Sequence, residues 1–318
     1  MSQQEKIADK RVWVMTEGMI GTQNQCLGVC DALSVIPTII QVQLKEPWKT
    51  FSPWLGFEQS WSFDFDMPAP YPDIIIAAGR KAIAAARFVK KKSPSTTILF
   101  LQNPKIDPKH FDLVAAPYHD NITGSNVIVT DGACNRINAP LLKEAAEKFD
   151  GVINTPNKLN IGVLFGGNSR THSLSEARMT EIIDLLTQID AHFMMTASRR
   201  TGAQNFKILQ RFADHGEHYL WNNQGDNPYH AILALSDIIF ATEDSVSMIS
   251  DAATAGKPVY VLPLEGSSAR FDRFHNHMHD LGVTRLLTSD TKIETWHYPP
   301  LKDTQKVADA LIKYMGLS

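Results

Sequence analysis

The chain has 318 residues, of which 43% are hydrophobic and 20% charged, a composition typical of a soluble protein long enough for two domains. Its 31 lysines and arginines against 34 aspartates and glutamates give a formal net charge of −3, so we expect no nucleic-acid partner. Cys26, Cys30 and Cys134 lack the spacing of a zinc site, and no apolar run approaches the roughly 20 residues of a membrane-spanning helix. These features predict a cytoplasmic protein with reduced thiols and no bound metal.

Short apolar runs alternate with helical patterns along the first part of the chain. Residues 73–78 form a continuous apolar run that ends before Gly79 and Arg80, and an alanine-rich helical pattern follows. The polar stretch 154–158 interrupts the alternation, and we place a hinge there. Strands are predicted over 11–15, 35–44, 73–78, 97–102, 113–116 and 126–130, and helices over 24–33 and 81–91.

The alternation restarts with the apolar run 160–165. Short apolar strands that alternate with helices predict an α/β fold with mainly parallel sheets, covered by helices on both faces. We therefore expect two Rossmann-like domains, 1–153 and 154–303, and a helix within 304–318 that packs back on the first domain. The remaining predicted strands are 192–196, 218–221, 237–241 and 258–262, and the helices are 175–188, 204–215, 229–236, 247–255 and 304–315.

Three strand-to-helix loops in the second half carry most of the polar chemistry. In an open parallel sheet, ligands bind outside the carboxyl ends of the strands, where helix N-termini attract phosphate. Glycines in the first loop allow close approach of an anion, arginines in the second suit a diphosphate, and hydroxyls and a carboxylate in the third suit phosphate and ribose. The expected binding residues are Gly166, Gly167, Ser169, Arg170, Thr196, Ser198, Arg199, Arg200, Thr242, Glu243, Asp244, Ser245, Ser247, Met248 and Asp251.

Each of these loops also has a simpler explanation. A glycine pair can form a tight turn, two arginines can make a solvated basic turn, and a serine or aspartate can cap a helix without any ligand. A cap needs only one such residue, whereas residues 242–251 offer several. We therefore favour a binding role for the second and third loops, and the first loop remains open between the two explanations.

Two loops in the first half are candidates for the acceptor and for acid–base chemistry. Residues 17–25 place two glycines and several amides between a strand and a helix; a plain glycine turn is the alternative. Residues 118–121 follow another strand and contain a His/Asp pair, which is more often a structural hydrogen bond than a catalytic pair. The expected residues are Gly18, Gly21 and Asn24 for the acceptor, and Glu17, His119 and Asp120 for catalysis.

Histidines and aromatic residues form two further clusters. His275, His277 and His279 alternate, but no cysteine stands at ligand spacing, so we expect a surface or cleft-lining role without metal. Residues 48–65 are rich in tryptophan and phenylalanine and contain few charges. They could form a membrane-facing or lipid-acceptor patch, although packing beneath a loop is the favoured interpretation.

Several short strings stand out along the chain: Glu17-Gly18, Gly79-Arg80, Gln102-Asn103-Pro104, Ser198-Arg199-Arg200-Thr201 and Asp244-Ser245-Val246-Ser247-Met248. Together they resemble the mitochondrial-fission ELM family, and the resemblance covers nearly the whole chain. That family is similar to GT-B glycosyltransferases, in which two Rossmann-like halves face a cleft and the C-terminal half holds the sugar nucleotide. Thr22 stands where many members have histidine, and Asp251 where such transferases usually have glutamate.

The resemblance implies a metal-independent glycosyltransferase that moves a sugar from a nucleotide-diphosphate sugar to a lipid-linked or polysaccharide acceptor of the cell envelope. No cofactor is expected. Asp120 or Glu17 would activate the acceptor hydroxyl, while Arg199 and Arg200 would stabilise the leaving diphosphate. A peripheral position on the inner face of the membrane is a further expectation. The alternatives are a non-catalytic adaptor that recruits partners at a membrane, and a non-hydrolysing sugar-nucleotide epimerase.

Overall fold

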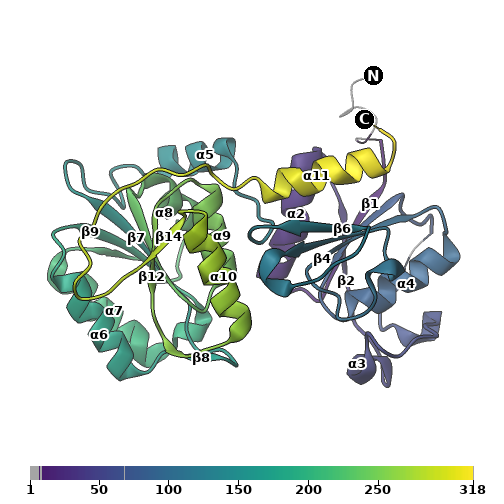
Figure 1. Ribbon diagram of the computed structural model, residues 1–318, viewed down its shortest axis with the longest axis horizontal. Helices are drawn as coiled ribbons and strands as arrows, with labels where there is room; N and C mark the ends of the chain where they lie inside the picture. Colours follow the sequence, from purple (N-terminus) through teal and green to yellow (C-terminus); the bar gives the residue numbers. More distant parts are fainter. Residues whose placement is uncertain (1–6, 8, 68, 318) are drawn as a thin grey trace. The chain divides into compact units, whose positions relative to one another are not determined.

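The chain forms two compact units, which are residues 1–136 together with 302–318 (unit 1) and residues 137–301 (unit 2). A computed structural model describes residues 7, 9–67 and 69–317 and is coloured along the sequence in Figure 1. Each unit is built around one six-stranded sheet. Within the described residues, no helix is long and apolar enough to cross a bilayer.

The sheet of unit 1 has the strand order β2-β1-β3-β4-β5-β6, and every neighbouring pair is parallel. Four of the strands are buried at every position, which explains why they read as continuous apolar runs in the sequence. The strands are β1 (Val12–Thr16), β2 (Thr38–Gln41), β3 (Ile74–Ala78), β4 (Thr97–Leu101), β5 (Leu113–Pro117) and β6 (Val127–Thr130).

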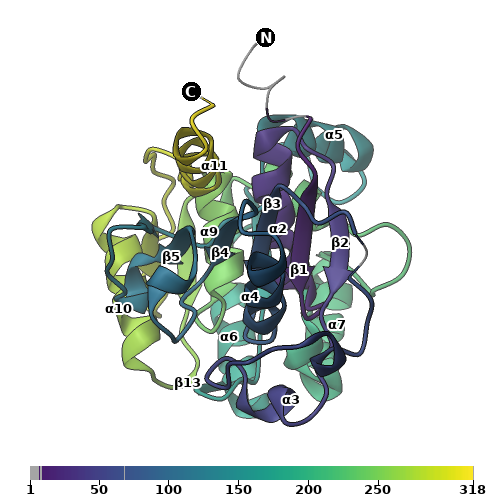
Figure 2. The same cartoon turned by 90° about the vertical axis from the view of Figure 1, so that its right-hand side faces the viewer.

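Helices cover both faces of this sheet. The helix α4 packs in one apolar layer, and α2 and α11 pack in the other; Figure 2 shows α4 in front of the strands. The carboxylate of Asp303 fastens the start of α11 to unit 1, because it accepts hydrogen bonds from the amides of Asp131 (2.9 Å) and Gly132 (2.8 Å). The helices are α2 (Ile20–Leu33), α3 (Trp48–Phe51), α4 (Ala82–Lys92) and α11 (Asp303–Tyr314), with 3-10 turns η1 (Ser60–Ser62), η2 (Pro108–His110) and η3 (Tyr118–Asp120).

The sheet of unit 2 repeats this design with the strand order β10-β9-β7-β11-β12-β14, again parallel throughout. A short antiparallel pair, β8 (His172–Ser173) and β13 (Glu265–Gly266), lies outside the sheet. The sheet strands are β7 (Asn160–Phe165), β9 (His192–Ala197), β10 (Tyr219–Leu220), β11 (Ile238–Thr242), β12 (Val259–Leu262) and β14 (Thr284–Leu286).

Six helices and one 3-10 turn complete unit 2. The helices α6 and α7 pack in one apolar layer, while α5, α8, α9 and α10 pack in the other. Their bounds are α5 (Ala139–Phe149), α6 (Glu176–Thr187), η4 (Arg199–Thr201), α7 (Ala203–Gly216), α8 (Tyr229–Leu235), α9 (Val246–Thr254) and α10 (Ala269–Asp280).

The predicted α/β class with mainly parallel sheets is confirmed, but unit 2 begins earlier than position 154. The helix α5 packs against α8, so it belongs to unit 2. Residues 154–158, where the sequence predicted a hinge, lie inside unit 2. The Thr155 amide donates to Asn160 Oδ1 (2.9 Å), and Asn160 Nδ2 donates to the Thr155 carbonyl (3.0 Å). The elements α3, α5, α10, β8, β13 and β14 are absent from the sequence-based prediction.

We expect residues 137–301 to fold independently and residues 154–303 to be much less stable. The second fragment lacks α5 together with Ile137 and Ile153, both buried in the apolar layer on that face. Loss of one buried isoleucine side chain costs roughly 2–5 kcal/mol. Thermal unfolding followed by far-ultraviolet circular dichroism measures the difference. Equal unfolding midpoints for the two fragments would place α5 outside the folded unit.

Candidate functional site

The three polar loops of unit 2 meet at one buried carboxylate, that of Asp244. Its oxygens accept hydrogen bonds from the amide of Gly167 (3.1 Å) and the hydroxyl of Thr242 (2.7 Å), and they form an ion pair with Arg200 Nη1 at 2.5 Å. The loops follow β7, β9 and β11, which are adjacent in the sheet. The structure therefore brings the predicted second-half loops together, with Asp244 as their shared partner.

The two glycines of the first loop serve this close packing. A Cβ atom on Gly166 would lie 2.3 Å from Asp244 Oδ1, and one on Gly167 would lie 2.2 Å from the carbonyl oxygen of Arg200. The backbone of Gly167 also has a φ of +144°, which side-chain-bearing residues rarely adopt. Neither position has room for any other residue while the loops stay together.

The amides of residues 166–169 in the first loop each have a protein acceptor. The amides of Gly166 and Gly167 donate to Thr242 Oγ1 (2.7 Å) and Asp244, and those of Asn168 and Ser169 donate to the carbonyls of Arg200 (3.0 Å) and His172 (2.8 Å). Loop-to-loop bonding thus occupies the donors that the sequence suggested for a phosphate. The geometry favours the tight-turn explanation for this loop.

Hydroxyl groups of the second loop complete the same network. Ser198 Oγ and Thr201 Oγ1 both donate to the carbonyl oxygen of Gly166, at 2.9 Å and 2.5 Å. Ser198 also caps the turn by accepting from the amide of Arg200 at 3.1 Å. Thr196 is buried at the end of β9. These hydroxyls hold the loop; Arg199 and Arg200 are both exposed, and Arg200 pairs with Asp244.

Donors without a protein partner remain around this network. Arg170 and Arg199 are exposed, and neither has an ion pair within the described part of the chain. At the start of α9, Ser245 accepts from the amide of Met248 (3.3 Å), while the amides of Val246 and Ser247 have no acceptor among the described residues. Free amides at a helix N-terminus attract anions. The polar surface available to a ligand is therefore the start of α9 with the two arginines.

Asp251, predicted to contact ribose, already has a partner from α8. Its Oδ2 accepts a hydrogen bond of 2.7 Å from the Tyr229 hydroxyl. Burial raises the pKa of Asp251 to about 7, and the hydrogen bond from Tyr229 offsets only part of that rise. Burial and the neighbouring carboxylate raise the pKa of Tyr229 well above its usual value. The sequence pattern contains no signal for this pair, because the two residues lie on different helices.

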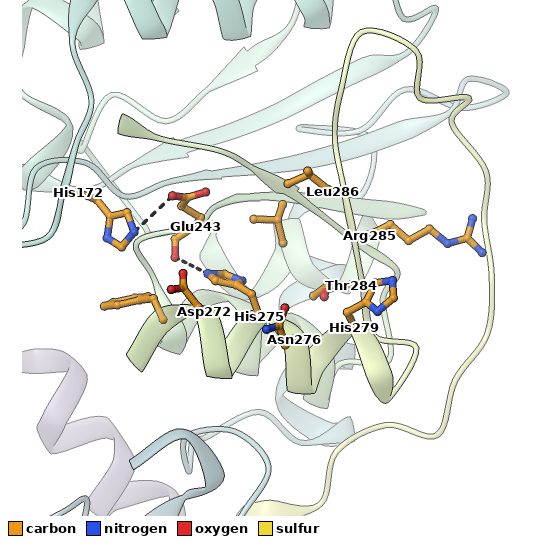
Figure 3. A pocket seen from close by; sticks show the side chains of 11 residues that line it. His172, Glu243, Asp272, His275, Asn276, His279, Thr284, Arg285 and Leu286 are labelled. Atoms are coloured by element: carbon orange, nitrogen blue, oxygen red, sulfur yellow. Dashed lines mark hydrogen bonds and ion pairs between the residues drawn. The ribbon is translucent and has the colours of Figure 1, made fainter. Parts of the chain in front are cut away.

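A pocket of about 470 Å³ extends from Glu243 along α10 to β14. Figure 3 shows His172 pointing toward the Glu243 carboxylate and His275 toward its backbone carbonyl. His172 Nε2 lies 3.3 Å from Glu243 Oε1, and His275 Nε2 donates to the carbonyl at 2.8 Å. Burial raises the pKa of Glu243 and lowers that of His275. The other lining residues are Val261, Phe271, Asp272, Asn276, His279, Thr284, Arg285 and Leu286.

Sequence patterns indicate Glu243 and the clustered histidines as candidates, but not the pocket that joins them. The helix α10 was not predicted, and only a helix puts His275 and His279 one turn apart on one face, with His277 directed elsewhere. Among the described residues, no group of three histidine, cysteine or acidic side chains could hold a metal ion. His172 carried no sequence signal, because its partner is 71 positions away in the chain.

The candidates in unit 1 follow the carboxyl ends of β1 and β5; they lie in the loop after β1, in the first turns of α2 and in η3. Glu17 is already engaged, since it accepts from the Lys81 amide (3.0 Å) and pairs with Lys81 Nζ (3.1 Å). The His119 and Asp120 side chains are buried in η3, with Nε2 and Oδ1 3.9 Å apart. Gly18 has a φ of +83°, and Gly21 and Asn24 are exposed in α2.

Relatives of known sequence match most of the chain. A family model described as mitochondrial fission ELM1 matches residues 20–315. The Arabidopsis thaliana mitochondrial fission protein ELM1 is 29% identical over 267 residues, which cover 74% of this chain and 62% of that protein. An uncharacterized Rickettsia prowazekii protein, RP120, is 28% identical over 286 residues, with 76% and 79% coverage. The chain thus spans less than two thirds of the Arabidopsis protein's length.

Solved structures of several other proteins have a similar fold. The UDP-GlcNAc 2-epimerase of Neisseria meningitidis, bound to UDP-GlcNAc, has a TM-score of 0.51 at 13% identity over 96% of this chain and 90% of that one. MurG of Acinetobacter baumannii has a TM-score of 0.50 at 13% identity (96% and 91% coverage), and MnaA of S. aureus in complex with UDP has 0.53 at 13% (96% and 88%). The chain therefore has the α/β fold of GT-B glycosyltransferases and UDP-sugar epimerases.

The pair formed by Asp251 and Tyr229 predicts a specific pH dependence of stability. The folded-state pKa of about 7 lies above the ordinary value of 3.8, so the folded protein binds more protons than the unfolded chain between these values. The free energy of unfolding should fall as pH rises from 4 to 7 and then level off. The Asp251→Asn variant keeps a hydrogen-bond acceptor for Tyr229, so its free energy of unfolding should not fall over this range. At neutral pH the variant should be more stable than the parent protein by at most about 4 kcal/mol.

Denaturant titrations of both proteins across this pH range measure the effect. The Asp184→Asn variant, which changes an exposed carboxylate on α6, serves as the control and should follow the parent protein. Parallel stability curves for Asp251→Asn and the parent would show that Asp251 is ionised in the folded protein at acidic pH.

Proposed function

The chain belongs to the mitochondrial fission ELM1 family, and from this starting point we propose that unit 2 binds a nucleotide-diphosphate sugar. The convergence of three loops on Asp244 carries the proposal, because it fixes the free start of α9 and the loop that bears the exposed Arg199 at the carboxyl end of a parallel sheet. Two proteins with the same fold have been solved with UDP-GlcNAc or UDP bound. These observations support a nucleotide sugar over a dinucleotide redox cofactor.

The diphosphate would bind the amides of Val246 and Ser247 and the guanidinium of Arg199. Backbone dipoles and an arginine stabilise the negative charge that develops on a leaving diphosphate, as a metal ion does in other enzymes. Arg200 would act indirectly, since its ion pair with Asp244 holds the loop. The adjoining pocket of about 470 Å³ falls in the usual range for small-ligand sites and would receive one end of the donor.

In the complete reaction, a cell-envelope acceptor hydroxyl would attack the anomeric carbon of the donor sugar. The bond from that carbon to the phosphate oxygen breaks, the nucleoside diphosphate leaves, and the hydroxyl proton passes to a base. We propose Asp120 or Glu17 as this base; His119 Nε2 lies 3.9 Å from Asp120 Oδ1, and the carboxylate of Glu17 pairs with Lys81. The acceptor would be a lipid-linked sugar or a polysaccharide.

A non-catalytic adaptor that recruits partners at a membrane is the second candidate. The saturated first loop favours it, because the amides of residues 166–169 hold the loops together without any ligand. A pure adaptor, however, has no physical need for the free amides of α9 or for an exposed arginine next to them. A measurement of nucleotide-sugar binding therefore distinguishes the transferase from the adaptor.

Two arginine variants should behave differently. Arg199→Ala removes an exposed donor and should weaken nucleotide binding by about 10- to 100-fold, with an unchanged melting temperature. Arg200→Ala should weaken binding and also destabilise the protein by about 1–3 kcal/mol, because the buried Asp244 loses its cation. Isothermal titration calorimetry with UDP-, CMP-, GDP- and ADP-sugars and thermal unfolding measure both quantities.

The control is Arg211→Ala, which removes an exposed arginine from α7 and should change neither binding nor stability. If none of these nucleotide sugars binds the native chain at millimolar concentration, the donor-site proposal is wrong and the adaptor remains. If binding survives in Arg199→Ala, the diphosphate lies elsewhere.

A further inference from the structure

The pocket of unit 2 contains a carboxylate–imidazole pair that binding of a diphosphate does not explain. The Glu243 carboxylate lies at one end of the pocket, and the His172 ring points toward it in Figure 3. His172 Nε2 is 3.3 Å from Glu243 Oε1. The side chain of His172 is 2% exposed, whereas that of Glu243 is 18% exposed. Glu243 is therefore the member of the pair that a molecule in the pocket can reach.

A third group, the hydroxyl of Thr171, fixes the state of the imidazole. Thr171 Oγ1 lies 3.0 Å from His172 Nδ1. Because Nε2 faces a carboxylate, it carries the proton of the neutral ring, and Nδ1 accepts from the Thr171 hydroxyl. An ionised carboxylate has about four acceptor positions, and that of Glu243 accepts from the His172 ring and the Leu264 amide. The carboxylate thus has acceptor positions left for a ligand or a water molecule.

The backbone of Glu243 is held from two sides. Its amide donates to the carbonyl of Leu262 (3.1 Å), and its carbonyl accepts from His275 Nε2 (2.8 Å). Burial raises the pKa of Glu243, and the nearby carboxylates of Asp244 and Asp272 add to the rise. A raised pKa makes a carboxylate a stronger proton acceptor, and a fixed backbone keeps it aligned. These are the properties of a general base.

The Glu243 carboxylate belongs to the same loop as the proposed phosphate donors. Two residues separate Glu243 from Val246, whose amide begins α9 and has no acceptor among the described residues. Three residues of extended chain span at most about 11 Å, so the pocket adjoins the start of α9. In a nucleotide-diphosphate sugar, one oxygen joins the terminal phosphorus to the anomeric carbon. A diphosphate bound at α9 would therefore bring the sugar within reach of Glu243.

We propose that unit 2 hydrolyses nucleotide-diphosphate sugars, with Glu243 as the general base that activates water. This inference rests on the proposed donor site and adds water as a second acceptor. The water oxygen bonds to the anomeric carbon while the bond from that carbon to the phosphate oxygen breaks. The water proton passes to Glu243, and the electron pair of the broken bond leaves with the nucleoside diphosphate. The free sugar is the other product, and Glu243 then returns its proton to solvent.

The groups that this reaction uses all lie in unit 2. Glu243 and His172 line the pocket, and the proposed diphosphate donors are Val246, Ser247 and Arg199. The pocket of about 470 Å³ has room for a sugar ring and a water molecule, whose share of liquid volume is about 30 Å³. Transfer to a sugar acceptor, by contrast, uses the proposed base from unit 1. In hydrolysis His172 is a positioning residue, because it touches Glu243 and neither the water nor the sugar.

Release of nucleoside diphosphate without any acceptor tests the proposal. The full chain is incubated with UDP-, GDP- and ADP-sugars in water enriched in heavy oxygen, and the products are separated and weighed by mass spectrometry. We expect at least one donor to be hydrolysed, with the heavy oxygen in the free sugar and not in the diphosphate. Glu243→Gln keeps an acceptor for His172 but cannot take a proton, so it should hydrolyse about 10²–10⁴-fold more slowly. Its affinity for the nucleoside diphosphate, measured by isothermal titration calorimetry, should be unchanged.

Two histidine variants test the positioning role. His172→Gln keeps an N–H donor for Glu243 and should retain most of the rate, whereas His172→Ala should lose about tenfold or more. The control is Glu181→Gln, which changes a glutamate on α6 with a 63% exposed side chain and should hydrolyse like the native chain. Thermal unfolding checks that each variant is folded.

The outcomes separate hydrolysis from donor binding. If the native chain binds a sugar nucleotide but releases no nucleoside diphosphate, the hydrolysis proposal is overturned and the donor site stands. It is also overturned if Glu243→Gln hydrolyses at the native rate, because the base then lies elsewhere. If no sugar nucleotide binds, the donor site and hydrolysis are wrong together.

Discussion

The burial of the Asp244 carboxylate is the constraint on which the polar end of unit 2 depends. A carboxylate removed from water needs hydrogen-bond donors and a cation, and Asp244 obtains them from Gly167, Thr242 and Arg200 on three different loops. Each donor must stay in place, so the ends of β7, β9 and β11 are fixed relative to one another. The positions of α9 and of the adjoining pocket follow from this requirement. A ligand that binds there meets groups already in place, which reduces the ordering cost of binding.

Much of the fold was predictable because fully buried parallel strands read as uninterrupted apolar runs. The three loops were predictable as well, since their polar residues directly follow such runs. The sequence could not show that Asp244 would use the donors of Gly167 and Arg200, because side-chain partners across loops leave no periodic signal. The helix α5 was not predicted, although Asn138 caps it by accepting from the amide of Leu141 (2.9 Å). Because α5 belongs to unit 2, the predicted start of unit 2 lies too far along the chain.

The two units carry different kinds of exposed chemistry. Unit 2 presents free amides, arginines and a pocket lined by histidine and carboxylate groups, all suited to a charged, hydrogen-bonding ligand. Unit 1 presents four exposed aromatic side chains between positions 48 and 65, those of Phe51, Trp54, Phe57 and Trp61. Sequence alone could not separate the buried members of that segment from the exposed ones, because Trp48 and Trp54 stand in similar apolar surroundings along the chain. Between them, the Arg80 guanidinium donates to the carbonyls of Lys49, Thr50 and Ser52, contacts across the chain that no local pattern signals.

The position of α11 affects how the protein folds during synthesis. This helix packs against α2 in unit 1, although all of unit 2 separates it from the rest of unit 1 in the chain. The ribosome therefore completes unit 2 before unit 1 receives its last helix. Until then, the apolar face around Cys26 and Cys30 lacks the cover of Val307 and Leu311. In the folded protein, burial raises the pKa of Cys30 and Cys134 to about 12, which suppresses thiolate chemistry. A nascent chain lacks part of this protection, and its unit 1 presents thiols and apolar surface to chaperones and oxidants for as long as unit 2 takes to be translated.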